Sequence, residues 1–153
     1  CIRDRFNWIR QDIEMAECKV VDLFCGSGVL GLEALSRGAV SACFVDYNMK
    51  SLEGIGSLLT RLNASQKATL INEEVLSWLE HNIGKQYDLV FLDPPFAFDN
   101  PTIYLSKVKH LLKKNGLVYL ENKSSTSITL DSEVECWRSA RAGTVHYGLY
   151  RIL

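Results

Sequence analysis

The run Asp93-Pro94-Pro95-Phe96 carries the strongest chemical signal in the sequence. It follows an apolar stretch over 87–92 that is typical of a buried parallel strand. Two consecutive prolines remove two backbone donors and fix φ, so the strand must end there. The corner then presents a carboxylate, backbone carbonyls and an aromatic ring at the carboxyl end of a strand, where open α/β sheets bind ligands. This acceptor-rich corner suits a planar group that carries an NH2, such as a nucleobase.

A glycine-rich loop is the second candidate site. Gly26, Gly28 and Gly31 have the spacing G-x-G-x-x-G between a predicted strand and a predicted helix. Glycines there allow a tight turn and let a ligand approach the backbone closely. Asp46 ends the next predicted strand, and a carboxylate at that position can accept two hydrogen bonds from a ribose diol. The pattern predicts a cofactor that contains a nucleoside, and dinucleotide enzymes show the same spacing.

Asp22, just before the loop, separates the two cofactors that fit this pattern. An acid there repels a pyrophosphate but suits the ammonium of a methionine moiety, which favours S-adenosylmethionine over NAD. The third strand ends in Glu73 and Glu74, for which two interpretations stay open. An acid there can accept from an adenine NH2 while the next backbone N–H, that of Val75, donates to a ring nitrogen. The same acids can also be solvated charges at a helix amino terminus.

The order of elements predicts how these residues come together. Apolar patterns alternate between strand and helix periodicity, which indicates a parallel sheet covered by helices on both faces. Strands are predicted over 19–24, 41–46, 68–72, 87–93 and 117–122, and helices over 3–15, 29–37, 49–62, 75–83 and 101–114. Two further strands, over 133–138 and 144–153, form a hairpin around Ala142-Gly143. Asn115-Gly116 is predicted to be the turn that closes the last helix.

The bulk composition fits one domain over 1–153. The chain has 153 residues, of which 47% are hydrophobic and 23% charged, and its net charge of −1 gives no global attraction for nucleic acid. Cys18, Cys25 and Cys43 lie in or beside apolar runs, so we expect buried reduced thiols and a cytosolic protein. No secretory signal or membrane-spanning stretch is visible, and the three histidines lack metal-ligand spacing, so no metal site is predicted.

With these motifs identified, the chain resembles the class I S-adenosylmethionine-dependent methyltransferases. Among them it is similar to the bacterial 16S ribosomal RNA guanine-N2 methyltransferases of the RsmD type. The resemblance spans most of the chain and is carried by Phe6-Asn7-Trp8, Val21-Asp22-Leu23-Phe24-Cys25-Gly26-Ser27-Gly28, the run over 30–39, Phe44-Val45-Asp46 and the run over 90–96. That family usually has alanine at the position of Cys25. It also usually carries a basic β-hairpin before the first helix, which this sequence does not show and which the resemblance implies would contact RNA.

The resemblance implies a Rossmann-like sheet of seven mostly parallel strands whose last strand is antiparallel. It also implies S-adenosylmethionine as cofactor, S-adenosylhomocysteine as product, and ribosomal RNA, free or in an assembling small subunit, as partner of a monomeric enzyme. The cofactor site would comprise Asp22, Phe24, Cys25, Gly26, Ser27, Gly28, Asp46, Glu74, Val75 and Asp93. The target guanine would be held by Asp93, Pro94, Pro95 and Phe96.

Three other functions fit parts of the pattern. An amine methyltransferase could act on adenine N6 in nucleic acid or on a protein glutamine amide, although such relatives usually have Asn at the position of Asp93. An NAD-binding Rossmann protein would leave Asp22 and the double proline without a role. A non-catalytic domain could have kept the cofactor pocket as a scaffold. Lysines 107, 109, 113 and 114, with His110, could meet phosphates, but such a cluster is more often a solvated helix face.

Overall fold

A mixed sheet runs through the centre of the molecule. The structure, a computed structural model, describes residues 1–84, 87–95, 100–123 and 127–153, and across these residues seven strands pair in the order β3-β2-β1-β4-β5-β7-β6. The strands are β1 (Lys19–Leu23), β2 (Ser41–Asp46), β3 (Ala68–Asn72), β4 (Tyr87–Leu92), β5 (Leu112–Lys123), β6 (Val134–Ala142) and β7 (Val145–Ile152). The first five are parallel, and β7 is antiparallel to both of its neighbours. The predicted sheet of seven strands with an antiparallel last strand is confirmed.

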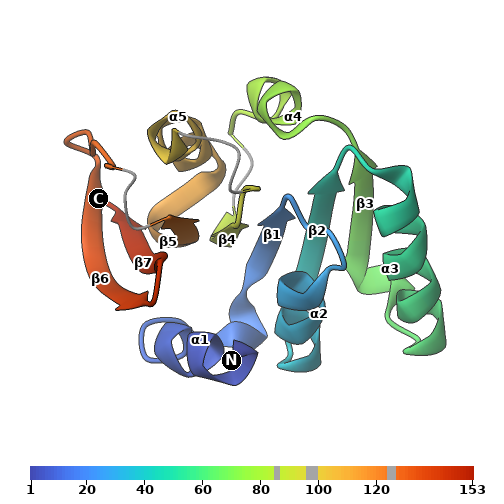
Figure 1. Cartoon of the computed structure of the whole chain (residues 1–153). Helices are drawn as coiled ribbons and strands as arrows, with labels where there is room; N and C mark the ends of the chain where they lie inside the picture. The colour runs from blue at the N-terminus through green and yellow to red at the C-terminus, as the bar shows by residue number, and fades with distance from the viewer. Residues whose placement is uncertain (85–86, 96–99, 124–126) are drawn as a thin grey trace.

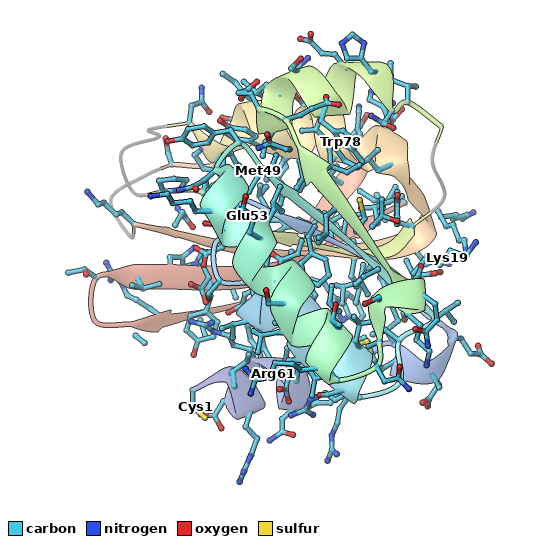
Figure 2. The ribbon with its side chains drawn as sticks, turned by 90° about the vertical axis from the view of Figure 1, so that its right-hand side faces the viewer. Cys1, Lys19, Met49, Glu53, Arg61 and Trp78 are labelled. Atoms are coloured by element: carbon cyan, nitrogen blue, oxygen red, sulfur yellow. The ribbon has the colours of Figure 1, made fainter. Side chains whose placement is uncertain are left out.

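Helices cover both faces of this sheet, as predicted (Figure 1). They are α1 (Ile2–Ile9), α2 (Val29–Ser36), α3 (Met49–Arg61), α4 (Val75–His81) and α5 (Pro101–Val108). The first three lie on one face and the last two on the other (Figure 1). Figure 2 shows α3 along its length, with Met49 and Arg61 near its ends.

Alternate side chains along each central strand pack into two separate hydrophobic cores, one on each face of the sheet. On β4, Phe91 packs with α1 to α3, whereas Leu92 packs with α4 and α5, because successive strand residues point to opposite faces. Cys18, Cys25 and Cys43 are buried and outside any disulfide, as predicted. Both faces are thus apolar, which explains the continuous apolar runs of the central strands.

The first helix is shorter than predicted. It ends at Ile9, and a 3₁₀ turn, η1 (Met15–Glu17), follows instead of the predicted helix to residue 15. The backbone tightens after Ile9, where the Asp12 N–H donates to the Ile9 carbonyl at 3.0 Å. The Asp12 carboxylate accepts from Trp137 Nε1 at 2.9 Å and pairs with Arg138 on β6. These long-range bonds draw the chain toward β6 and outweigh local helical periodicity.

The last helix also ends early. It stops at Val108 and passes through a 3₁₀ turn, η3 (Lys109–Leu111), into β5, so the predictions of helix to 114 and of a strand start at 117 were wrong. Leu112 already pairs with Tyr87 of β4, and the register then shifts before Leu89 meets Leu117. Asn115, with φ of 66°, lies in this irregular part of β5. It therefore supports a bulge rather than the end of a helix.

The basic cluster near α5 is paired with acids. Lys107 lies 3.4 Å from Glu80, and Lys113 lies 3.0 Å from Asp88. Lys109 binds both Asp131 at 2.7 Å and Glu133 at 2.9 Å. These pairs support the interpretation of a solvated surface over that of a phosphate-binding face. Among the described residues, none of the helices has the length and apolar character needed to cross a membrane.

Close packing of α2 against β2 gives a test of the fold. A Cβ at Gly31 would lie 2.4 Å from Cε1 of Phe44, whose side chain is fully buried. We therefore expect Gly31→Ala to lower the free energy of unfolding by about 1–3 kcal/mol in urea titrations, through overpacking. Gly54→Ala is the matched control, because an added Cβ on this exposed helical glycine meets nothing within 4 Å. It should be neutral or stabilising, and an equal loss in both variants would contradict the packing argument.

Candidate active site

The glycine loop between β1 and α2 has an unusual backbone. Phe24, Gly26 and Gly28 have positive φ values of 55°, 52° and 78°. A left-handed conformation costs a residue such as Phe24 roughly 1–2 kcal/mol, and such strain is concentrated at functional sites. The Phe24 ring packs edge-on against Tyr104 of α5, with centroids 5.3 Å apart. Ser27 is exposed at the tip, so its hydroxyl is open to a ligand.

The two predicted acids flank this loop and bind its backbone. Asp22 Oδ2 accepts from the Gly31 N–H at 3.0 Å, in the first turn of α2. Asp46 Oδ2 accepts from the Gly26 N–H at 2.9 Å, and its Oδ1 accepts from the Asn48 N–H at 2.9 Å. Both carboxylates thus fix the loop, a role that the sequence analysis did not assign to them. Each carboxylate oxygen can accept more than one hydrogen bond, so Asp46 retains acceptor capacity for a ribose diol.

Asp22 is buried, with 2% of its surface exposed. Burial, with smaller contributions from Asp93 and Asp46, raises its pKa to about 8 against the lowering effect of the Gly31 hydrogen bond. Burial thus favours the neutral form of this carboxyl in the protein alone. A positive charge placed beside it would favour the ionised form, so binding a cation there is coupled to proton release.

Glu74 lies two residues after the end of β3 and caps α4. Its Oε1 accepts from the Leu76 N–H at 3.0 Å and its Oε2 from the Ser77 N–H at 2.8 Å. This geometry supports the interpretation of Glu74 as a helix-start charge. Val75 is buried in the first turn of α4. Contact of Glu74 and Val75 with an adenine stays a prediction.

The Asp93 corner lies next to the glycine loop. Leu23 and Leu92 are paired in register between β1 and β4, so Asp93 follows β4 at the level where Phe24 follows β1. The sheet order reverses between these two strands, and open α/β sheets bind their ligands at such a switch point. Pro94 is buried and Pro95 exposed, while Phe96 lies outside the described residues. The structure therefore brings the two predicted halves of the site together.

The electrostatic environment of Asp93 is set by two residues that the sequence analysis missed. Burial and, to a smaller extent, the charge of Glu121 raise the pKa of Asp93 to about 6, against the lowering effect of Arg5. Arg5 Nη2 of α1 lies 2.7 Å from Glu121 Oε1 of β5, and the Tyr119 hydroxyl donates to the same oxygen at 2.8 Å. A charged residue within the apolar run over 117–122 was the one signal for Glu121, and no local pattern links it to Arg5.

These groups suit a cationic ligand better than an anionic one. Asp22 and Asp46 bind the backbone of the loop, and Asp93 follows the neighbouring strand. A sulfonium and an ammonium are attracted to such a site, whereas a pyrophosphate is repelled. In the described part of the chain, no group of three or more His, Cys, Asp or Glu side chains could hold a metal ion. The arrangement therefore fits S-adenosylmethionine.

The sheet order, the strained glycine loop and the acids that flank it define a class I methyltransferase. The family described as Conserved hypothetical protein 95 matches residues 3–151, and the chain belongs to this family, which includes the ribosomal RNA small subunit methyltransferases D. The chain is 34% identical over 149 residues to the Escherichia coli K12 protein of that name, covering 95% of this chain and 73% of the relative. It is 33% identical over 150 residues to the Haemophilus influenzae protein of that name, covering 95% and 77%.

Solved structures give the same result. The Escherichia coli protein yhhF superposes with a TM-score of 0.90 at 28% identity, over 99% of this chain and 84% of that chain. The Haemophilus influenzae protein HI0767 superposes with a TM-score of 0.88 at 31% identity, over 100% and 99% of the two chains. The fold of the family thus extends across the whole of this chain.

The cofactor site can be tested by calorimetric titration with S-adenosylmethionine, S-adenosylhomocysteine and NAD. We expect both adenosyl ligands to bind and NAD not to bind. Asp46→Ala should weaken adenosyl binding about 10- to 100-fold, because it removes hydrogen bonds to a charged acceptor.

Asp88→Ala is the matched control for this titration. Asp88 also accepts from a backbone N–H, that of Lys19 at 2.9 Å, but it lies at the opposite end of β4. Its substitution should leave the affinity for both adenosyl ligands unchanged. Binding of NAD alone would contradict the assignment of the site.

Proposed function

We propose that this protein transfers a methyl group from S-adenosylmethionine to the exocyclic N2 of a guanine in small-subunit ribosomal RNA. The names of its curated relatives support the RNA substrate. The single observation that carries the choice of N2 is the Asp93-Pro94 corner beside the glycine loop. It offers carboxylate and carbonyl acceptors where an NH2 group would have to lie.

The residues around the loop would hold the cofactor. Gly26, Ser27 and Gly28, with Phe24 and Cys25, would form the floor beneath its methionine part, and Asp22 would receive its ammonium. Asp46 would accept from the ribose hydroxyls, and Glu74 with Val75 would meet the adenine edge. S-adenosylmethionine supplies a reactive methyl group on a positively charged sulfur when it is bound.

Asp93 would be the residue that binds N2 and accepts its proton. The N2 lone pair of guanine is delocalised into the ring, so alignment and a more tetrahedral nitrogen are what the protein must provide. An ionised Asp93 would accept one N2 hydrogen, and the Pro94 carbonyl would accept the other. Positive charge that develops on N2 is stabilised by the carboxylate, which can then take the released proton.

The rest of the corner would receive the base. Pro95 stiffens the turn, and Phe96 would stack on the guanine, a contact worth roughly 1–3 kcal/mol. The target nucleotide must be unpaired or flipped out of a helix to reach the corner. We propose that one domain over 1–153 acts as a monomer in the cytoplasm, on RNA that is free or in an assembling small subunit.

The product identifies the function. Small ribosomal subunits and naked 16S RNA from Escherichia coli lacking its own methyltransferase D are incubated with labelled S-adenosylmethionine, and the RNA is digested to nucleosides for mass spectrometry. We expect N2-methylguanosine in at least one of the two substrates. Asp93→Asn should reduce the rate about 10²-fold or more, and Asp88→Ala should not. N6-methyladenosine, or label in ribosomal protein, would contradict the proposal.

The pKa of Asp93 gives a pH dependence. Because its pKa is raised to about 6, Asp93 becomes protonated as the pH falls through 6. The protonated carboxyl can no longer take the proton that N2 releases, and it is a weaker acceptor for the N2 hydrogen. We therefore expect kcat/KM to fall below about pH 6 and to level off above pH 7. The residual activity of Asp93→Asn should lack this acid limb, with folding checked by circular dichroism at each pH. An unchanged acid limb in Asp93→Asn would assign the titration to another group.

A further inference from the structure

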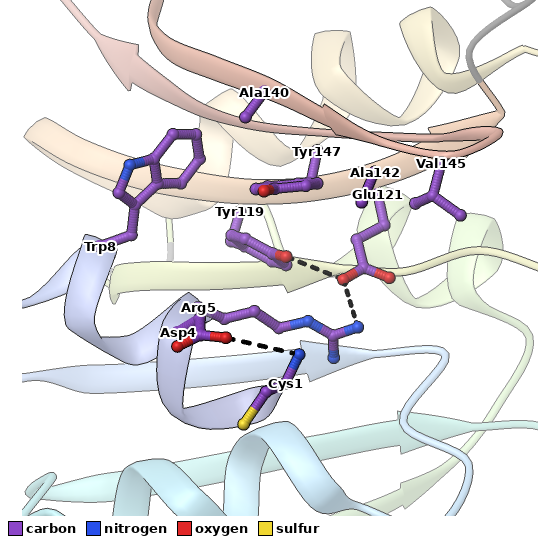
Figure 3. A pocket seen from close by; sticks show the side chains of 10 residues that line it. All are labelled: Cys1, Asp4, Arg5, Trp8, Tyr119, Glu121, Ala140, Ala142, Val145 and Tyr147. Carbon is purple, nitrogen blue, oxygen red and sulfur yellow. Dashed lines mark hydrogen bonds and ion pairs between the residues drawn. The ribbon is translucent and has the colours of Figure 1, made fainter.

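Arg5 and Glu121, whose charges act on Asp93, line a pocket. It has a volume of about 630 Å³ and lies between α1 and the strands β5, β6 and β7. Figure 3 shows its lining, in which Arg5 and Trp8 of α1 face Tyr119, Glu121 and Tyr147 of the sheet. Aromatic rings together with a few charged groups, among them Asp4, Arg5 and Glu121, suit a nucleoside in a pocket of this size.

The strand register places Asp93 next to Glu121, a residue that lines this pocket. Leu92 pairs with Leu120, so Asp93 and Glu121 stand at the same level on neighbouring strands and on the same face of the sheet. Glu121 in turn pairs with Tyr147 of β7. A base whose amino group donates a hydrogen bond to Asp93 would therefore have the neighbouring ring nitrogen next to Glu121.

Glu121 has one oxygen that is fixed and one that is available. The residue is 6% exposed, and the ion pair with Arg5 and the hydrogen bond from Tyr119 both end on Oε1. The two dashed lines that reach Glu121 in Figure 3 accordingly meet at one oxygen. Oε2 has no partner in the described part of the chain. Oε2 is also not among the fully buried polar atoms, so it is open to the pocket that Glu121 lines and can accept a hydrogen bond from a ligand there.

The partners of Oε1 keep Glu121 an acceptor. Arg5 carries a permanent positive charge and meets Oε1 as a donor. Tyr119 remains an O–H donor because burial and the charge of Glu121 both raise its pKa. Oε2 thus has a fixed place and can accept hydrogen bonds but not donate them.

We propose that Glu121 Oε2 accepts the N1–H of the target guanine and so selects guanine over adenine, an inference that rests on the proposed function. Guanine presents N1–H and N2–H2 as neighbouring donors on one edge, which matches Glu121 beside Asp93. Adenine carries a lone pair at N1, which the carboxylate repels. Glu121 is in this sense the specificity-determining residue, and Arg5 and Tyr119 position it.

A base analogue tests this contact directly. Once the methylated guanine is mapped by the product assay, 16S RNA is joined from fragments that carry either guanine or 2-aminopurine at that position. The analogue retains the N2 amino group but has a lone pair at N1 and lacks O6. We expect the wild-type protein to prefer guanine by roughly 10- to 100-fold in kcat/KM. Equal rates on the two RNAs would overturn the proposal without recourse to any variant.

Glu121→Gln separates the N1 contact from other differences between the bases. Its amide oxygen can keep the donors Arg5 and Tyr119, which turns the NH2 toward the pocket. That donor opposes the N1–H of guanine but suits the N1 lone pair of 2-aminopurine. The preference for guanine should therefore shrink at least about 10-fold, chiefly through loss of the guanine rate, while S-adenosylmethionine affinity is retained. Because the variant leaves the Arg5 charge without its ion-pair partner, its folding at the assay temperature is checked by circular dichroism.

The control is Glu135→Gln, which alters another glutamate paired with an arginine, Arg151, between β6 and β7. It should keep the wild-type preference. Equal losses on both RNAs in Glu121→Gln would show a merely structural role and overturn the inference, with the proposed function intact. Absence of methylation of either RNA by the wild-type protein, with cofactor binding preserved, would overturn the proposed function itself and this inference with it.

Discussion

The parallel register of β1, β4 and β5 is the constraint on which the rest of the site depends. Alternation along each strand places Asp22, Asp93 and Glu121 two residues beyond core residues on the α1 side of the sheet. These three acids lie on the face of the sheet that elsewhere carries the hydrophobic core, and together they form a row of acids near the carboxyl ends of the strands. Neighbouring carboxylates repel one another, and burial adds the cost of desolvation. The fold must offset this repulsion and desolvation cost with hydrogen bonds or ion pairs. Which acids receive such partners determines what the site can bind.

Compensation is uneven along the row. Asp22 receives the Gly31 N–H, and Glu121 receives Arg5 and Tyr119, whereas Asp93 has no hydrogen bond within the described part of the chain. Asp93 thus keeps its acceptor capacity and a raised pKa, which are typical of a group that acts on a ligand. A cationic cofactor on one side and the NH2 of a base on the other would each reduce the repulsion in the row. The negative charge of the site is in this view the driving force for both ligands.

The sequence was sufficient for the sheet and for half of the site, because both depend on local patterns. The strands over 41–46 and 68–72 were predicted to the residue, and Asp22, Asp46 and Asp93 were found because each lies at or next to the carboxyl end of an apolar strand. The ends of α1 and α5 were mispredicted because contacts distant in sequence decide them. Asp12 binds residues of β6, and Leu112 joins β4 while still in a helical pattern. The sequence analysis could not supply the capping role of Glu74 with certainty, since the same acid fitted two interpretations.

Arg5 and Glu121 were beyond sequence reasoning for a further physical reason. Their pairing requires α1 to pack across the sheet, and Phe6 and Ile9 provide this packing, with the Phe6 ring centroid 5.5 Å from that of Phe91. Removing either partner of a largely buried ion pair leaves an uncompensated charge and costs far more than the pair contributes. The first helix thus anchors the core and also fixes the acceptor that we assign to guanine N1. Mutations that loosen α1 should therefore reduce base discrimination before they unfold the sheet, because the position of Arg5 depends on that helix alone.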